Sequence, residues 1–120
     1  MKGVEDLEIW RRSDELAYKI YSITNQFPKH EEFALTSQIR RSALSVPANI
    51  VEGYYRNSKR EFIRFLYISI ASLSETRYFI RFALRLKYIQ ICDFDLLRQE
   101  SEELAKMITG FIKSLKVEIA

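Results

Sequence analysis

Apolar residues recur at steps of three or four along most of this sequence, and no segment shows the alternation of a β-strand. The pattern divides the chain into amphipathic segments at about 4–26, 28–52 and 58–87, followed by a last one that starts at Asp93, a residue of the N-cap type. Short connections join these segments. We therefore expect an all-α fold of one domain over residues 1–120, an antiparallel up-down-up-down four-helix bundle.

Local signals predict the turn between the second and third helices. Gly53 can supply the positive φ that ends a helix. Ser58 and Glu61 form the S-x-x-E pattern of a capping box, which starts the next helix. We expect the turn at residues 53–57 and a third helix of roughly 45 Å, the longest element.

The second predicted helix has two ordered faces on a wheel of about 100° per residue. Its apolar sector contains Leu35, Ile39, Ala43, Val46 and Ile50, and its polar sector contains Gln38, Arg41, Ser42, Ser45, Asn49 and Glu52. We favour a packing layer or subunit interface for Gln38, Arg41, Ser45, Asn49 and Glu52, in which Gln38, Asn49 and Glu52 meet arginines of a neighbouring helix or subunit. The alternative is a surface for a ligand or nucleic acid.

The third predicted helix is apolar on more than one side. Its inner face contains Phe62, Phe65, Ser69, Leu73, Thr76, Ile80 and Ala83. On its outer face five arginines (60, 64, 77, 81 and 85) are interleaved with Ile63, Tyr67, Ile70, Tyr78 and Phe82. Exposed apolar patches mark interaction sites. The pattern therefore predicts a homo-oligomer that assembles through this helix.

Positive charge is concentrated in the middle of the chain. Residues 38–87 contain ten Lys or Arg and three acidic residues, whereas the remainder is net negative. Arginine can bind phosphate bidentately and tyrosine can stack on unpaired bases. The candidate nucleic-acid-binding residues are Arg56, Lys59, Arg60, Arg64, Arg77, Arg81, Arg85, Tyr67 and Tyr78. The same residue types are also typical of a wet subunit interface, so both interpretations stay open.

The residue inventory argues against catalysis. His30 and Cys92 are the only histidine and cysteine, and the three glycines do not form a phosphate-binding loop. We expect a non-enzymatic protein without a metal or cofactor, with His30 at the surface and Cys92 partly buried. No stretch has the order of a signal peptide or the roughly 20 apolar residues of a membrane span. We therefore expect a cytoplasmic protein that does not bind membranes.

An ordered set of residues resembles a known family over nearly the whole chain. The set comprises Leu7, Trp10, Leu16, Tyr21, Phe27-Pro28, Glu31, the run 35–41 (LTSQIRR), the run 45–50 (SVPANI), Glu52-Gly53, Arg56, Ser58, Glu61-Phe62, Phe65-Leu66, Ser72 and Glu75. This sequence is similar to the small four-helix-bundle proteins encoded in intervening sequences of bacterial 23S ribosomal RNA genes. It departs from the family's usual residues at Ser13, Ser42, Val51 and Tyr55.

The resemblance implies an up-and-down bundle that assembles as a ring-shaped homopentamer without known enzymatic activity. A related branch looks like the accessory proteins of diversity-generating retroelements, which are basic pentamers that bind a reverse transcriptase and nucleic acid. The net charge of +3 does not favour that branch.

Our leading hypothesis is an oligomeric bundle that binds RNA or other nucleic acid. The alternatives are a scaffold that docks another protein and a purely structural oligomer.

Overall fold

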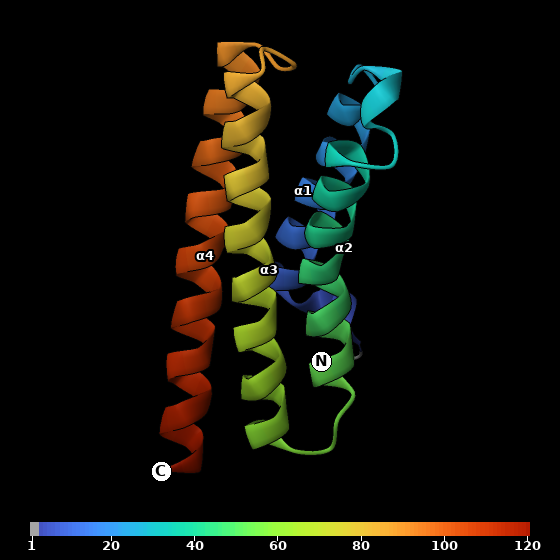
Figure 1. Ribbon diagram of the computed structural model, residues 1–120. Coiled ribbons are helices and arrows are strands. Elements are labelled where there is room, and N and C mark those ends of the chain that lie inside the picture. Colours follow the sequence, from blue (N-terminus) through green and yellow to red (C-terminus); the bar gives the residue numbers. More distant parts are fainter. Residues whose placement is uncertain (1–2) are drawn as a thin grey trace.

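A computed structural model describes residues 3–120 of the chain. Its four α-helices are α1 (Glu8–Thr24), α2 (Leu35–Tyr54), α3 (Lys59–Arg85) and α4 (Ile91–Ile119). Two short 3₁₀ helices, η1 (Val4–Asp6) and η2 (Lys29–Glu31), precede α1 and α2, and no strand occurs in residues 3–120. The all-α fold expected from the sequence is confirmed (Figure 1).

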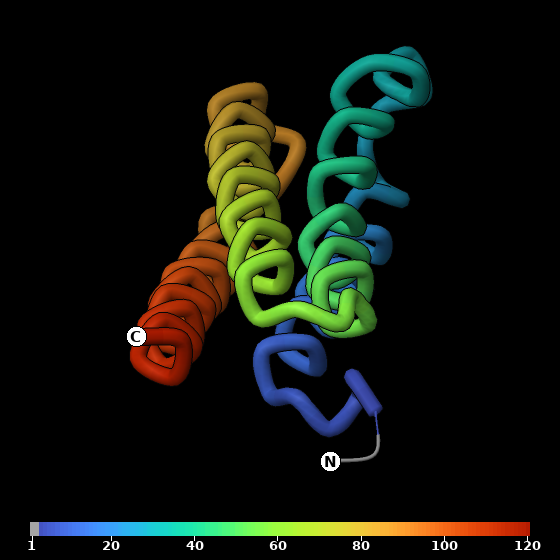
Figure 2. Tube along the Cα trace, turned by 90° about the horizontal axis from the view of Figure 1, so that it is seen from below, coloured from blue at the N-terminus to red at the C-terminus, as the bar shows by residue number. Residues whose placement is uncertain are grey.

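The four helices pack side by side along a common direction. In Figure 1 the chain rises along α1, descends along α2, rises along α3 and descends along α4. Contacts join α1 to α2, α2 to α3, α3 to α4 and α4 back to α1. Figure 2 shows α3 between α2 and α4. The molecule is a rod with extents of 47 × 24 × 22 Å, so α3 presents a long outer surface.

One hydrophobic core receives side chains from all four helices. Leu16, Ile50, Leu66 and Leu104 come from α1 to α4 in order, and each is at most 2% exposed. Burying a side chain of this size contributes about 1.5–3 kcal/mol relative to leaving it in water. Of the predicted inner faces, only Leu35 is incompletely buried: α2 buries Ile39, Ala43, Val46 and Ile50, and α3 buries Phe62, Phe65, Ser69, Leu73, Thr76, Ile80 and Ala83.

The outer face of α3 differs from the sequence prediction at two positions. Ile63 and Ile70 are half-buried and pack against the core, because α4 covers that side of α3. A wheel drawn for one helix does not show which side its neighbour covers. The large apolar side chains that the middle of α3 exposes are Tyr67, Ile68, Tyr78 and Phe82, at 36–59%.

Two helix starts differ from the predicted ones. The chain forms η2 after Pro28, and α2 begins only at Leu35, whose backbone N–H donates to the Glu31 carboxylate at 3.3 Å. The last helix begins at Ile91, so Asp93 lies in its first turn and is not the N-cap. The cap predicted at Ser58 is confirmed, since its hydroxyl oxygen accepts from the Glu61 N–H at 3.2 Å.

The C-terminal end of α3 is closed without glycine. Lys87 adopts the left-handed φ of 64°. Its N–H donates to the Leu84 carbonyl at 2.9 Å, and the Tyr88 N–H donates to the Ala83 carbonyl at 2.9 Å. These two bonds are the Schellman motif, which satisfies carbonyls at the end of a helix. The turn toward α4 is therefore defined by backbone hydrogen bonds.

Gly53 plays a different role from the predicted one. The helix continues through Gly53 to Tyr54, and no glycine among residues 3–120 has a positive φ. A Cβ at Gly53 would lie 2.7 Å from Phe65 Cβ and 2.9 Å from Phe62 Cδ1. Glycine is therefore required for the close approach of α2 to α3, and the turn shifts to residues 55–58.

A tyrosine ties η2 to the turn between α3 and α4. The Tyr88 hydroxyl donates to Glu31 Oε2 at 2.8 Å, and its ring packs on Phe27 with centroids 5.4 Å apart. The Tyr88 hydrogen bond, followed by the bond from the Leu35 N–H, lowers the pKa of Glu31 below its usual 4.5. The same bond raises the pKa of Tyr88 above its usual 10.0.

This contact makes stability depend on pH. A lowered carboxyl pKa stabilises the fold above the unfolded value of 4.5, and the contribution is lost as the pH falls through the folded pKa. We expect Tyr88→Phe to lower the free energy of unfolding more at pH 7 than at pH 3, in urea titrations at both values. Tyr18→Phe is the control, because Tyr18 is 65% exposed. An equal effect of Tyr88→Phe at both pH values would contradict the assignment.

Candidate nucleic-acid interface

The turn between α2 and α3 gathers charged side chains around one aromatic ring. Arg56 Nε lies 3.0 Å from Glu52 Oε2. Arg64 donates to both oxygens of Glu61, from Nε at 3.2 Å and from Nη2 at 3.1 Å. The guanidinium carbons of Arg56 and Arg64 lie 4.9 and 4.5 Å from the centroid of the Phe65 ring. Cation–π contacts of this kind restrain both arginines near the turn.

Electrostatics at this turn favours the ionised forms of its acidic and basic groups. The hydrogen bond from Arg64 lowers the pKa of Glu61 below 4.5, and the same bond raises the pKa of Arg64. Lys59 Nζ lies 2.6 Å from Glu118 Oε1 of α4. The candidate residues Arg56, Lys59 and Arg64 are thus paired with carboxylates of the same chain, and phosphate would have to compete for them.

Other candidate arginines carry no such partner. Within residues 3–120, Arg60, Arg81 and Arg85 make no ion pair at 4.0 Å or less, and all three are exposed. Arg77 is half-buried and approaches Glu102 Oε2 of α4 at 3.9 Å. The unpaired positive charge of α3 therefore lies at its two ends, at Arg60 and at the pair Arg81 and Arg85.

The two candidate tyrosines lie on the same helix in different surroundings. The Tyr67 hydroxyl accepts from Lys116 Nζ at 2.7 Å, and that nitrogen lies 5.2 Å from the ring centroid. Tyr78 is 59% exposed, and its centroid lies 5.8 Å from that of Phe79 and 6.2 Å from that of Phe82. Both rings are accessible on the surface between Arg60 and Arg85.

In the part of the chain that the structure describes, the polar sector of α2 does not pair with arginines of a neighbouring helix, and pairing with another subunit stays a prediction. Asn49 donates to the Ser45 hydroxyl at 2.9 Å and to the Ser45 carbonyl at 2.8 Å, and Ser45 contacts the Ser72 hydroxyl of α3 at 2.9 Å. Glu52 meets Arg56, which follows its own helix. Gln38 and Arg41 are exposed and form no side-chain hydrogen bond or ion pair among residues 3–120. Hydroxyls, which are shorter than guanidinium groups, make the link between α2 and α3.

Buried hydroxyl groups form further hydrogen bonds between α2 and α3, and we call this line of hydroxyl contacts the seam. Thr76 donates to the Ser42 hydroxyl at 2.8 Å, and Ser69 donates to the Val46 carbonyl at 2.9 Å. Within residues 3–120, no buried side-chain N or O atom lacks a hydrogen-bond partner. This seam is satisfied and holds α2 against α3, so it is structural within the chain.

The single histidine and the single cysteine both lie at the surface. Among residues 3–120, no three His, Cys, Asp or Glu side chains cluster as metal ligands would. His30 lies exposed in η2, as predicted, and Cys92 is exposed where we expected partial burial, because it points outward from the first turn of α4. In the same described part of the chain, no helix is long and apolar enough to cross a bilayer.

Sequence reasoning missed the contribution of α4 to this surface. Arg98 Nη1 lies 2.8 Å from Glu102 Oε2, and Arg77 of α3 approaches the same oxygen. The i,i+4 spacing of Arg98 and Glu102 was readable in the sequence. Their position opposite Arg77 depends on the rotation of α4 against α3, which the spacing does not reveal.

Comparisons with known proteins agree with this architecture. The model of the family described as 23S rRNA-intervening sequence protein matches residues 5–110. A crystal structure of a protein of unknown function from the S23 ribosomal protein family of Bacteroides thetaiotaomicron is similar, with a TM-score of 0.78 and 30% identity. The similarity covers 88% of this chain and 98% of that one. Among curated proteins, none matches the chain.

Proposed function

Because this chain belongs to the family of 23S rRNA-intervening sequence proteins, we propose that it is a non-enzymatic, self-associating bundle that binds RNA or other nucleic acid. The proposal comprises one cytoplasmic domain over residues 1–120 with antiparallel up-down-up-down helices, and the ring-shaped pentamer that the family resemblance implies. The shared core and the alternating directions of the helices in Figure 1 support the first part.

One observation carries the proposal of nucleic-acid binding. Arg60, Arg81 and Arg85 are exposed without a carboxylate partner among residues 3–120, on a helix that also exposes Tyr67 and Tyr78. From Arg60 to Arg85 this surface is about 38 Å long, at 1.5 Å per residue. Unpaired guanidinium groups with interleaved aromatic rings suit the phosphates and unpaired bases of a single strand. Several copies in an oligomer would multiply this surface.

A second surface supports self-association. Ile68, Ala71, Glu75 and Phe82 are exposed and lie at heptad-like steps along α3. On α2, Leu44 and Ala48 are also exposed. We refer to these six residues as the assembly stripe. On a wheel of about 100° per residue, Tyr78 lies between the assembly stripe and the three arginines Arg77, Arg81 and Arg85 of the C-terminal half of α3.

A salt titration tests nucleic-acid binding. Affinity for single-stranded nucleic acid falls with salt by a slope of about 0.7 per phosphate contact. For four contacts we expect about a fiftyfold loss between 50 and 200 mM salt in gel shifts with a single-stranded RNA. Combined Arg60→Gln, Arg81→Gln and Arg85→Gln should reduce the slope by about 2. Lys29→Gln, at an exposed site in η2, is the control.

The same titration can reject the proposal. No binding above background at 50 mM salt would overturn it, as would an unchanged slope in the triple variant. A structured RNA and a single-stranded DNA, tested in parallel, identify the preferred nucleic acid.

A further inference from the structure

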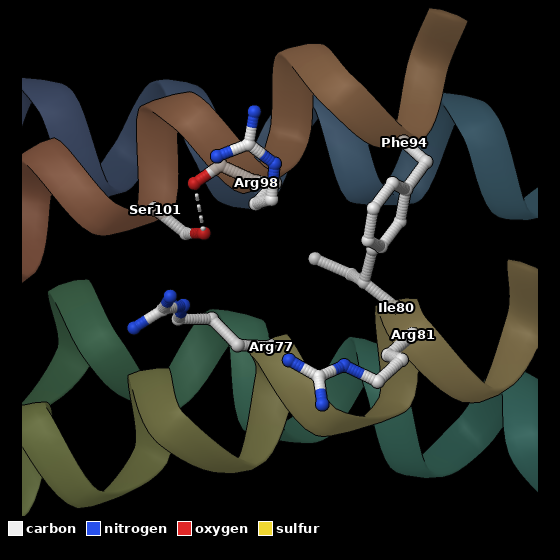
Figure 3. A pocket seen from close by; sticks show the side chains of 6 residues that line it. All are labelled: Arg77, Ile80, Arg81, Phe94, Arg98 and Ser101. Atoms are coloured by element: carbon white, nitrogen blue, oxygen red, sulfur yellow. Dashed lines mark hydrogen bonds between the residues drawn. The ribbon is translucent and has the colours of Figure 1, made fainter. Parts of the chain in front are cut away.

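Three arginines from two helices surround a hollow between α3 and α4. Arg77 and Arg81 lie one turn apart on α3, and Arg98 lies on α4. Figure 3 shows the two α3 arginines on one side of the hollow and Arg98 with Ser101 and Phe94 on the other. Two of these guanidinium groups were predicted to bind nucleic acid, but their convergence with the third depends on the fold.

The charges at this cluster do not cancel. Among residues 3–120, Glu102 is the one carboxylate within 4.0 Å of any of the three guanidinium groups, at 2.8 Å from Arg98 and 3.9 Å from Arg77. The hydrogen bond from Arg98 lowers the pKa of Glu102 below 4.5, with smaller contributions from Arg77 and Lys106. Glu102 is therefore ionised at neutral pH. Three guanidinium groups and one carboxylate leave two positive charges.

Further charges lie along the same two helices. On α3, Arg85 lies one turn after Arg81 and makes no ion pair within 4.0 Å among residues 3–120. On α4, Asp95 lies one turn before Arg98, and Lys106 lies one turn after Glu102. Neither makes an ion pair within 4.0 Å in the described part of the chain. Asp95 and Lys106 are of opposite sign, and Arg85 adds to the two excess positive charges at the hollow.

We infer that this cluster binds a phosphate monoester, such as the terminal phosphate of an RNA strand. The inference rests on the proposed function and deepens it by naming a subsite. A phosphate monoester carries about −1.5 to −2 charge at pH 7, whereas each internal phosphodiester of a strand carries one negative charge. The two excess positive charges match the monoester better. Guanidinium groups also present paired N–H donors with the geometry that phosphate oxygens require.

The shape of the hollow sets where the phosphate would lie. Its volume is about 20 Å³, room for about one water molecule. The phosphate therefore lies at the mouth, against the guanidinium groups. The half-buried Phe94 and the buried Ile80 supply the apolar part of the lining. The Ser101 hydroxyl donates its proton to the Arg98 carbonyl at 3.0 Å, so it does not donate to the phosphate.

The test compares two single-stranded RNAs that differ only at the 5′ end. One carries a 5′-phosphate and the other a 5′-hydroxyl, and fluorescence anisotropy measures their affinities at equal salt. We expect the phosphorylated RNA to bind about fivefold more tightly, as one added phosphate group gives when it pairs with guanidinium groups at a partly exposed site. Arg81→Gln should abolish this preference, whereas Lys29→Gln should retain it. Equal affinities for the two RNAs would overturn the inference and leave the proposed function intact.

A second experiment distinguishes failure of the proposed nucleic-acid binding from failure of the phosphate subsite. If neither RNA binds, the proposed function is overturned. Binding of inorganic phosphate then tests the subsite by itself. In NMR titrations against potassium chloride of equal ionic strength, phosphate should shift the amide signals of residues 77–81 and 94–101 in the wild type. Loss of these shifts in Arg81→Gln supports the subsite. The absence of shifts in the wild type would overturn it.

Discussion

Gly53→Ala is expected to lower the free energy of unfolding by about 2 kcal/mol, the usual effect of overpacking a close contact. The added methyl group would lie 2.7 Å from Phe65 Cβ and 3.3 Å from the Phe62 carbonyl oxygen. A Cβ is attached to the backbone and cannot rotate away. Relief therefore requires α2 and α3 to separate, which would also strain the Ser69 bond to the Val46 carbonyl. Urea unfolding followed by circular dichroism measures the effect.

Gly110→Ala provides the matched control. Gly110 lies inside α4, exposed, and a Cβ there would meet nothing within 4 Å. Alanine is more favourable than glycine in a helix by about 1 kcal/mol, so this change should raise stability. The same substitution in two helices thus has opposite expected signs. If Gly53→Ala also raised stability, close approach would not be the reason for glycine at that position.

The sequence predicts the parts of the fold that depend on one helix at a time. The spacing of apolar residues identified the four helices and the inner face of α3, and the Ser58 cap formed as expected. Features that depend on two helices were predicted less well. Gly53 looked like a helix terminator because its contacts with Phe62 and Phe65 come from the next helix. Lys87 gave no signal, since lysine rarely adopts a positive φ.

In the candidate site, too, features of one helix could be predicted from the sequence, whereas contacts between two helices could not. Charge pattern identified the arginines of α3, and the structure separates those with carboxylate partners, such as Arg64, from those without, such as Arg81. No single-helix argument could pair Lys59 with Glu118 or place Arg98 beside Arg77, because both contacts depend on how α4 packs against α3. Surface function in a bundle therefore has to be inferred from pairs of helices.

Ala71→Arg is expected to convert the proposed oligomer into a monomer of about 14.3 kDa. Ala71 is exposed in the middle of the assembly stripe, where a small side chain would allow another copy to approach closely. Arginine there would place a long charged side chain between the apolar residues Ile68 and Phe82. Glu75, one turn further along α3, could pair with this charge. The expected loss of assembly therefore comes from the length of the arginine side chain, which would hold two copies apart, and from the cost of removing charged groups from water. Light scattering coupled to size exclusion measures the mass.

The control has to separate lost assembly from lost folding or altered charge. Arginine is nearly as favourable in a helix as alanine, and exposure of Ala71 leaves the core untouched, so the helical circular dichroism signal should be unchanged. Gln99→Arg adds the same charge at an exposed site of α4 and should leave the mass of the oligomer unchanged. A wild-type protein that is monomeric at micromolar concentration would refute the assembly proposal. An Ala71→Arg oligomer of unaltered mass would instead place the interface on another face.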